Sequence, residues 1–252
     1  MVVQEDIPMM ELFRKSVNAS REALAKVEVR EELTYHYAIV RVYSKMLVTS
    51  CAIYTLLING YPDDAMALCR QLYESLVIID ILLKGKQKND TELLERFMDA
   101  PAIMALRDDY ETLSYALKHD PNDQYAKSQM KMLVQEIQKY TQKYQKDRIE
   151  AFKDYWWSGY DSFGKMAQQS DFPKGYMYSL LSDKVHMNAL GAFHYLDNSE
   201  PGIHLGDGQS VKTSSAVEIM PFIMPFCLIY YANHGIINTS TVKRRDLDVS
   251  GR

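Results

Sequence analysis

The sequence predicts an all-α protein, a single-domain helical bundle of about seven helices with one long helix that extends from it. Eleven glycines and eight prolines in 252 residues are few for a barrel or sandwich of many short strands, which needs more turn residues. Hydrophobic residues make up 47% and charged residues 25%, as in ordinary globular proteins. We expect the domain to cover residues 1–237 and a flexible C-terminal tail to cover 238–252.

The first two helices are expected at residues 8–28 and at about 31–58. Leu12, Val17 and Leu24 are among the apolar positions of the first, amphipathic helix. The segment 37–58 is apolar but carries Arg41 and Lys45, so it lacks the charge-free run of about 20 residues that a membrane span needs. We therefore expect a buried bundle helix there.

The third helix has the clearest boundary signals in the chain. Asn59 and Gly60 form a break, Pro62 suits a first helical turn, and Gly85 is expected near the end. The segment between them is apolar on nearly all sides, which is typical of a helix in the middle of a bundle.

Residues 90–118 are expected to be helical with a bend or break at Pro101, and a turn is expected at 119–123. A polar helix is predicted from Gln124 to about Tyr155. Its apolar stripe is thin and consists of Met130, Leu133, Val134, Ile137 and Tyr144. A thin stripe favours an outer helix or an arm that packs against a partner, such as a second copy of the chain.

The remainder of the chain alternates loops and helices. Residues 156–175 predict a structured loop with one short helix, and 198–215 predict a Gly, Pro and Ser-rich loop. Helices are expected at 176–196 and 216–237. The last one contains Pro221, Pro225 and Glu218, so it too is expected to be a bundle helix and not a membrane span.

Charge and cysteine content favour a cytoplasmic protein that binds neither a membrane nor DNA. The formal net charge is −4, which gives no overall attraction to nucleic acid or acidic lipid. The number of cysteines is odd, since the chain has three: Cys51, Cys69 and Cys227. They lack CxxC spacing and lie in apolar surroundings, as buried thiols in a reducing compartment do. The first residues show no secretion signal.

Arg70 and Glu74 are a candidate polar site on the third helix. They are four residues apart and share a helix face, so they can form an ion pair. Their neighbours, including Tyr73, are mostly apolar, and burying either charge unpaired is costly. Two interpretations stay open: a buried pair that fixes helix register, or a ligand-binding or catalytic pair.

Ser182 and His186 repeat this spacing within a largely apolar run. A lone histidine among apolar neighbours is often a core residue whose hydrogen bonds are satisfied. Contact between His186 and Glu74 would raise the pKa of His186 and fix its tautomer. A metal site is not expected, because His186 and His194 are eight residues apart, roughly 12 Å along a helix.

A ribonuclease is the second hypothesis. Arg30 and His36 are separated by five residues, a spacing that resembles the Arg-x(4 to 6)-His signature of helical ribonuclease toxins, although about 0.8 such matches are expected by chance. Five lysines over 127–146 are interleaved with Tyr140 and Tyr144, a pattern that suits RNA but more often belongs to a solvated helix face.

Three segments resemble a bacterial family known only as domain-of-unknown-function family five-six-seven-seven. They are GYPDDAMALCRQLYESLVIIDILLKG, YWWSGYDSFGKMA and YSLLSDKVHMNALGAF, in that order, and the resemblance covers about 40–196. It implies a set of characteristic residues: Arg70, Glu74, Trp157, Ser158, Gly159, Ser182 and His186. It brings no established reaction.

From the residues and the resemblance together we expect a binding or regulatory module with an internal polar site. Its candidate catalytic residues are Arg70, Glu74 and His186, and its ligand-binding set adds Tyr73, Trp157, Ser158 and Ser182. No cofactor and no metal are expected. The alternatives are a ribonuclease-like toxin or phage-defence enzyme with a histidine general base, and a structural homodimer. A second copy of the chain, a small molecule and RNA stay open as partners, and no sequence feature supports the last two.

Overall fold

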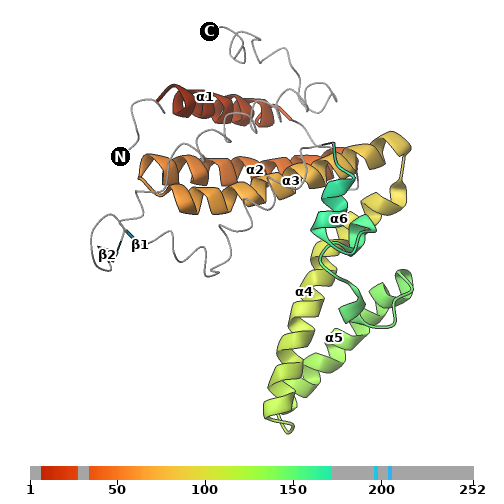
Figure 1. Cartoon of the computed structure of the whole chain (residues 1–252). Coiled ribbons are helices and arrows are strands. Elements are labelled where there is room, and N and C mark those ends of the chain that lie inside the picture. The colour runs from red at the N-terminus through yellow and green to blue at the C-terminus, as the bar shows by residue number, and fades with distance from the viewer. Residues whose placement is uncertain (1–6, 28–33, 172–195, 198–203, 206–252) are drawn as a thin grey trace. The chain divides into compact units, whose positions relative to one another are not determined.

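The computed structural model describes residues 7–27, 34–171, 196–197 and 204–205, and within them the protein is all-α (Figure 1). These residues form six α-helices, two 3₁₀ turns and one small antiparallel pair of strands, which confirms the predicted fold class. The strands β1 (Leu196–Asp197) and β2 (His204–Leu205) have two residues each and were not predicted. Of the helix expected over 176–196, only Leu196 is among the described residues, and it lies in β1, so the prediction is wrong at that residue. The helix expected over 216–237 lies outside the described residues.

The chain divides into two compact units. The first comprises 1–32, 39–80 and 171–252, and the second comprises 33–38 and 81–170. The single domain over 1–237 therefore stays a prediction, as does the tail at 238–252, which lies outside the described residues.

Two helices precede the central one. In α1 (Ile7–Leu24), Phe13 is buried and its ring lies 6.1 Å from that of Tyr54 in α2 (Tyr35–Ile58). The second helix begins four residues later than expected, where Thr34 Oγ1 accepts the backbone N–H of Tyr37 at 3.1 Å. No helix in the described ranges is long and apolar enough to cross a membrane.

The central helix α3 (Pro62–Lys88) begins at the predicted residue, after a turn in which Gly60 has a φ of 81°. Several sides of this helix are buried, and its buried side chains include Cys69, Leu72, Val77, Ile79, Leu82 and Leu83. The helix continues past Gly85 and ends three residues later, where Asn89 adopts a φ of 53°. Gly85 therefore lies near the end without forming it.

Helix α4 (Thr91–His119) starts with a side-chain cap: Asp90 Oδ1 accepts the N–H of Leu93 at 2.9 Å. It continues through Pro101, so of the predicted bend or break the break is wrong, and the bend stays a prediction. The expected turn follows, and Asp123 caps α5 (Gln124–Lys143) by accepting the N–H of Ala126 at 3.0 Å.

Helix α5 is shorter than predicted. It ends at Lys143, and Gln145 turns the chain with a φ of 50°, so the expected helix to Tyr155 is wrong over its last 12 residues. The chain continues through η2 (Ile149–Ala151), η3 (Trp156–Ser158) and α6 (Phe163–Gln168), which confirms the predicted loop with one short helix up to Asp171.

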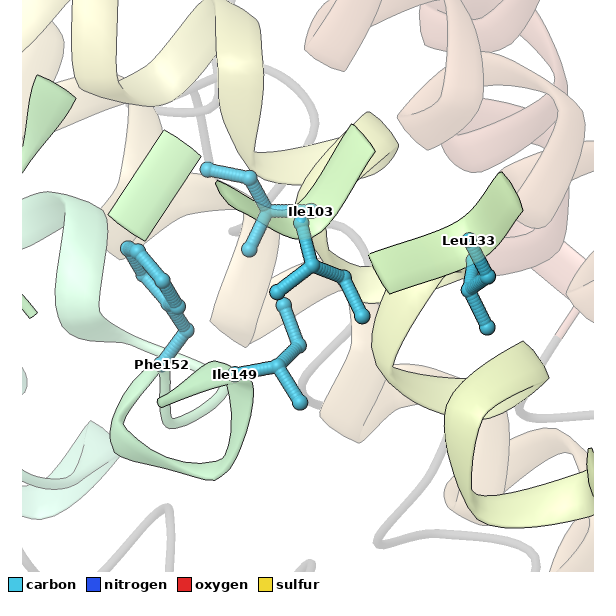
Figure 2. Close-up of a cluster of buried hydrophobic side chains, with 5 residues drawn as sticks. Ile103, Leu133, Ile149 and Phe152 are labelled. Atoms are coloured by element: carbon cyan, nitrogen blue, oxygen red, sulfur yellow. The ribbon is translucent and has the colours of Figure 1, made fainter. Parts of the chain in front are cut away.

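The thin apolar stripe of α5 packs within its own chain. Helices α4 and α5 lie side by side (Figure 1), and Leu133 and Ile137 of α5 form a buried cluster with Ile103, Ile149 and Phe152 (Figure 2). Burial of this kind stabilises a hairpin by roughly 1.5–3 kcal/mol per large side chain. The homodimer stays a prediction, but the apolar residues of α5 that suggested it pack against α4 and the η2 turn.

Candidate functional site

Arg70 and Glu74 form the predicted ion pair on α3. Arg70 Nε donates to Glu74 Oε1 at 3.0 Å, and the side chains are 19% and 26% exposed. Both charges are thus largely removed from water but still reachable at the surface. Between them, Tyr73 is buried, and burial raises the pKa of its hydroxyl, so this group stays neutral and able to donate a hydrogen bond.

A second acidic residue of α3 was missed by sequence reasoning. Asp80 is fully buried, and its Oδ2 accepts the backbone N–H of Asp171 at 3.1 Å. This bond attaches the chain after α6 to the middle of α3, across 91 positions of sequence. The available signal was a single charge within VIIDILL, since a carboxylate in such a run needs a partner.

Trp157 and Ser158 lie in the η3 turn, and both are buried. The Trp157 ring meets Phe97 of α4 edge to face, with centroids 4.9 Å apart. Ser158 Oγ donates to the carbonyl of Tyr155 at 2.7 Å and accepts the N–H of Tyr160 at 3.3 Å. The hydroxyl is therefore engaged in forming the turn, and its proton points to a backbone oxygen.

Gly159 completes this turn with a φ of 81°, a conformation that glycine adopts without strain. The Trp-Ser-Gly sequence thus supplies a packed ring, a hydroxyl that bonds the turn and a left-handed residue. All three residues therefore contribute to the structure of this turn.

Arg96 is a second residue that sequence reasoning missed. Its Nε donates to the Trp157 carbonyl oxygen at 3.1 Å, and its Nη1 pairs with Glu92 Oε1 at 2.6 Å. The Glu92–Arg96 spacing of four was the local signal for the ion pair. The bond to Trp157 had no signal, because it joins α4 to a turn far along the chain.

The predicted site residues fall into three groups. Arg70, Tyr73 and Glu74 belong to the first unit, and Trp157 and Ser158 belong to the second. Ser182 and His186 lie outside the described residues. The structure thus brings Arg70 to Glu74 and Trp157 to Ser158, while convergence of all seven residues on one site stays a prediction.

The residues of the ribonuclease hypothesis are only partly described. His36 lies at the start of α2, where burial lowers its pKa and the neighbouring Lys86 lowers it further, so the neutral imidazole is favoured. A neutral imidazole is the form that a general base needs. Arg30 lies outside the described residues, so this hypothesis stays a prediction. Within the described part of the chain, no group of three or more His, Cys, Asp or Glu side chains is arranged to hold a metal ion.

Comparison with known proteins identifies one family. No curated protein and no solved structure matches the chain. A family of unknown function, DUF5677, matches residues 36–203. This range includes the Arg70–Glu74 pair, the Trp-Ser-Gly turn, and the segment with Ser182 and His186. The chain is a member of the family of unknown function DUF5677.

Proposed function

We propose that the protein is a cytoplasmic binding or regulatory module whose internal polar site contains Arg70, Glu74 and His186 and which does not turn over its ligand. The observation that carries this proposal is the partly buried ion pair on α3, with exposed fractions of 19% and 26%. Each charge is shielded enough to bind strongly and exposed enough to be reached.

A purely structural role accounts for this pair less well. Buried or half-buried ion pairs add little net stability, because desolvation offsets the attraction between the charges. The order with arginine before glutamate is also the weaker one on a helix. An apolar pair of similar size would hold α3 in its bundle at least as well.

The chemistry of the pair suggests the class of ligand. A guanidinium binds carboxylate or phosphate oxygens, and a carboxylate accepts hydrogen bonds from amino or hydroxyl groups. The neutral hydroxyl of Tyr73 adds a donor on the same helix. A small polar molecule that carries both an anionic group and a donor group fits these requirements.

The thiols support the proposed compartment. Cys51 carries a free thiol, and the Sγ of Cys69 donates to the carbonyl of Ala65 at 3.0 Å. Burial raises the pKa of Cys69 far above its ordinary value, so its reactive thiolate does not form near neutral pH. Thiols of this kind are typical of proteins in a reducing cytoplasm.

A ligand screen by thermal unfolding tests the proposal. We expect a small polar molecule from a metabolite library to raise the Tm of the full chain, and to be recovered chemically unchanged after incubation. Arg70→Gln, Glu74→Gln and His186→Gln should each abolish the rise. Lys139→Gln is the matched control, since it removes an exposed ion pair with Glu136. A ligand whose effect survives all three site variants would contradict the proposal, and recovery of a product would show turnover.

A further inference from the structure

The second unit contains a cavity of about 190 Å³. Of the predicted binding residues that the structure describes, Ser158 alone lines it. It lies where the last turns of α3 meet the first turns of α4, and residues of the η3 turn and the end of α6 close it. At roughly 30 Å³ for each water molecule, it has room for about six waters.

Three basic side chains line this cavity: Lys84 and Lys88 from α3, and Arg96 from α4. Lys84 Nζ donates to the carbonyl oxygen of Gln169 at 2.7 Å, which fixes the ammonium at the wall. Arg96 is fixed by its bonds to Trp157 and Glu92. Two of the three cations are therefore held in place before any ligand arrives, which reduces the entropy lost on binding.

The negative groups near the cavity do not cancel this charge. Asp90 is the one carboxylate among the described residues of the lining, and its Oδ1 accepts the N–H of Leu93 as the cap of α4. Glu92 pairs with Arg96 but is 73% exposed, so solvent screens it. With Glu92 counted as well, three cations against two carboxylates still leave the described lining positive.

We propose that this cavity binds the phosphate group of a small phosphorylated ligand. Arginine and lysine together are the usual partners of phosphate, and an anionic group matches the excess of positive charge in the cavity. Ser158 and Tyr160 also line the cavity. The volume admits a phosphate with a small organic group attached.

This inference is independent of the proposed function at Arg70 and Glu74, because every residue it uses belongs to the second unit. It also gives the Trp-Ser-Gly turn a role beyond its own folding. The turn that Arg96 holds forms part of the cavity wall, so the position of Ser158 depends on the same guanidinium that faces the ligand.

Calorimetric titration of the full chain with inorganic phosphate and with pyrophosphate tests the inference, with sodium chloride at equal ionic strength as the reference. We expect saturable binding of both anions and none of chloride. Lys88→Gln should weaken phosphate binding about tenfold, since a charge-assisted hydrogen bond contributes about 1.5 kcal/mol or more. Lys88 is exposed, so the variant should fold, which circular dichroism verifies.

Lys86→Gln is the matched control, because Lys86 is exposed in the same last turn of α3 but does not line the cavity. Its affinity for phosphate should stay within about twofold of the wild type, as expected for a screened surface charge. Absence of saturable phosphate binding by the wild type would overturn the inference. Equal weakening by Lys86→Gln and Lys88→Gln would also overturn it, since that result indicates a general charge effect.

Discussion

Arg96 Nε donates a hydrogen bond to the backbone carbonyl oxygen of Trp157 at 3.1 Å, and so joins α4 to a turn 61 positions later in the chain. A hydrogen bond between a side chain and a backbone group so far apart in the sequence fixes tertiary structure that no local propensity specifies. Here the bond places the Trp-Ser-Gly turn against α4, where the Trp157 ring also packs on Phe97.

Arg96→Met should lower the free energy of unfolding by about 1–3 kcal/mol, because it leaves the Trp157 carbonyl without its charged donor. Urea denaturation measures this change. The matched variant Glu92→Gln removes the exposed half of the Glu92–Arg96 pair and should cost less than about 1 kcal/mol. Equal costs for the two variants would show that the ion pair, and not the bond to Trp157, is the important contact.

Gly85→Ala should destabilise the protein by about 1–3 kcal/mol, although alanine is the better helix former. A Cβ at position 85 would lie 2.5 Å from Leu93 Cδ2 and still closer to the Tyr35 hydroxyl, which itself bonds to the carbonyl of Asp90. Gly164→Ala is the matched control in α6, because a Cβ there meets no atom within 4 Å. Urea denaturation should show no loss for Gly164→Ala, and a stabilised Gly85→Ala protein would contradict the packing described here.

Stability should fall as the pH rises above about 10. Burial raises the pKa of Tyr144 above its ordinary value, and the bond from its hydroxyl to Asp99 Oδ2, 2.6 Å long, raises it further. Burial lowers the pKa of Lys143, but its bonds to Asp99 and Glu95 outweigh this and leave that pKa raised as well. The unfolded chain therefore releases these protons first, and stability is lost with rising pH.

Tyr144→Phe should reduce this alkaline loss, in urea denaturations at pH 9, 10 and 11, and should cost about 1 kcal/mol at pH 7 through the lost hydrogen bond. The control is Tyr125→Phe, which changes an exposed tyrosine in the first turn of α5. The same pH dependence in both variants and the wild type would mean that Tyr144 does not contribute to the alkaline transition.

Local signals predicted the parts of the fold that depend on local chemistry. Gly60 and Pro62 set the boundary between α2 and α3, and the four-residue spacing of Arg70 and Glu74 produced the observed pair. The end of α5 was missed, because Gln145 turns the chain with a positive φ that glutamine rarely adopts. Next to it, Tyr144 is held by Asp99, a residue 45 positions away.

Contacts between residues far apart in the sequence also explain two other features of the structure that the sequence did not predict. Gly85 lies near the end of α3 as expected, but the sequence did not predict that its small size allows Tyr35 and Leu93 to approach α3 closely. The cavity lined by Lys84, Lys88 and Arg96 was not foreseen, because it forms only when residues from three parts of the chain come together.

The central claim is that His186 shares a site with the Arg70–Glu74 pair, and the pKa of His186 tests it most directly. Titration of the six histidines by NMR, with His186 assigned through His186→Gln, should give a His186 pKa that falls by about 1 pH unit in Glu74→Gln. The loss of a neighbouring carboxylate explains that fall, since it removes the charge that stabilises the imidazolium. Glu136→Gln, which removes an exposed carboxylate, should leave the pKa unchanged. An identical His186 pKa in the wild type and in Glu74→Gln would contradict the claim.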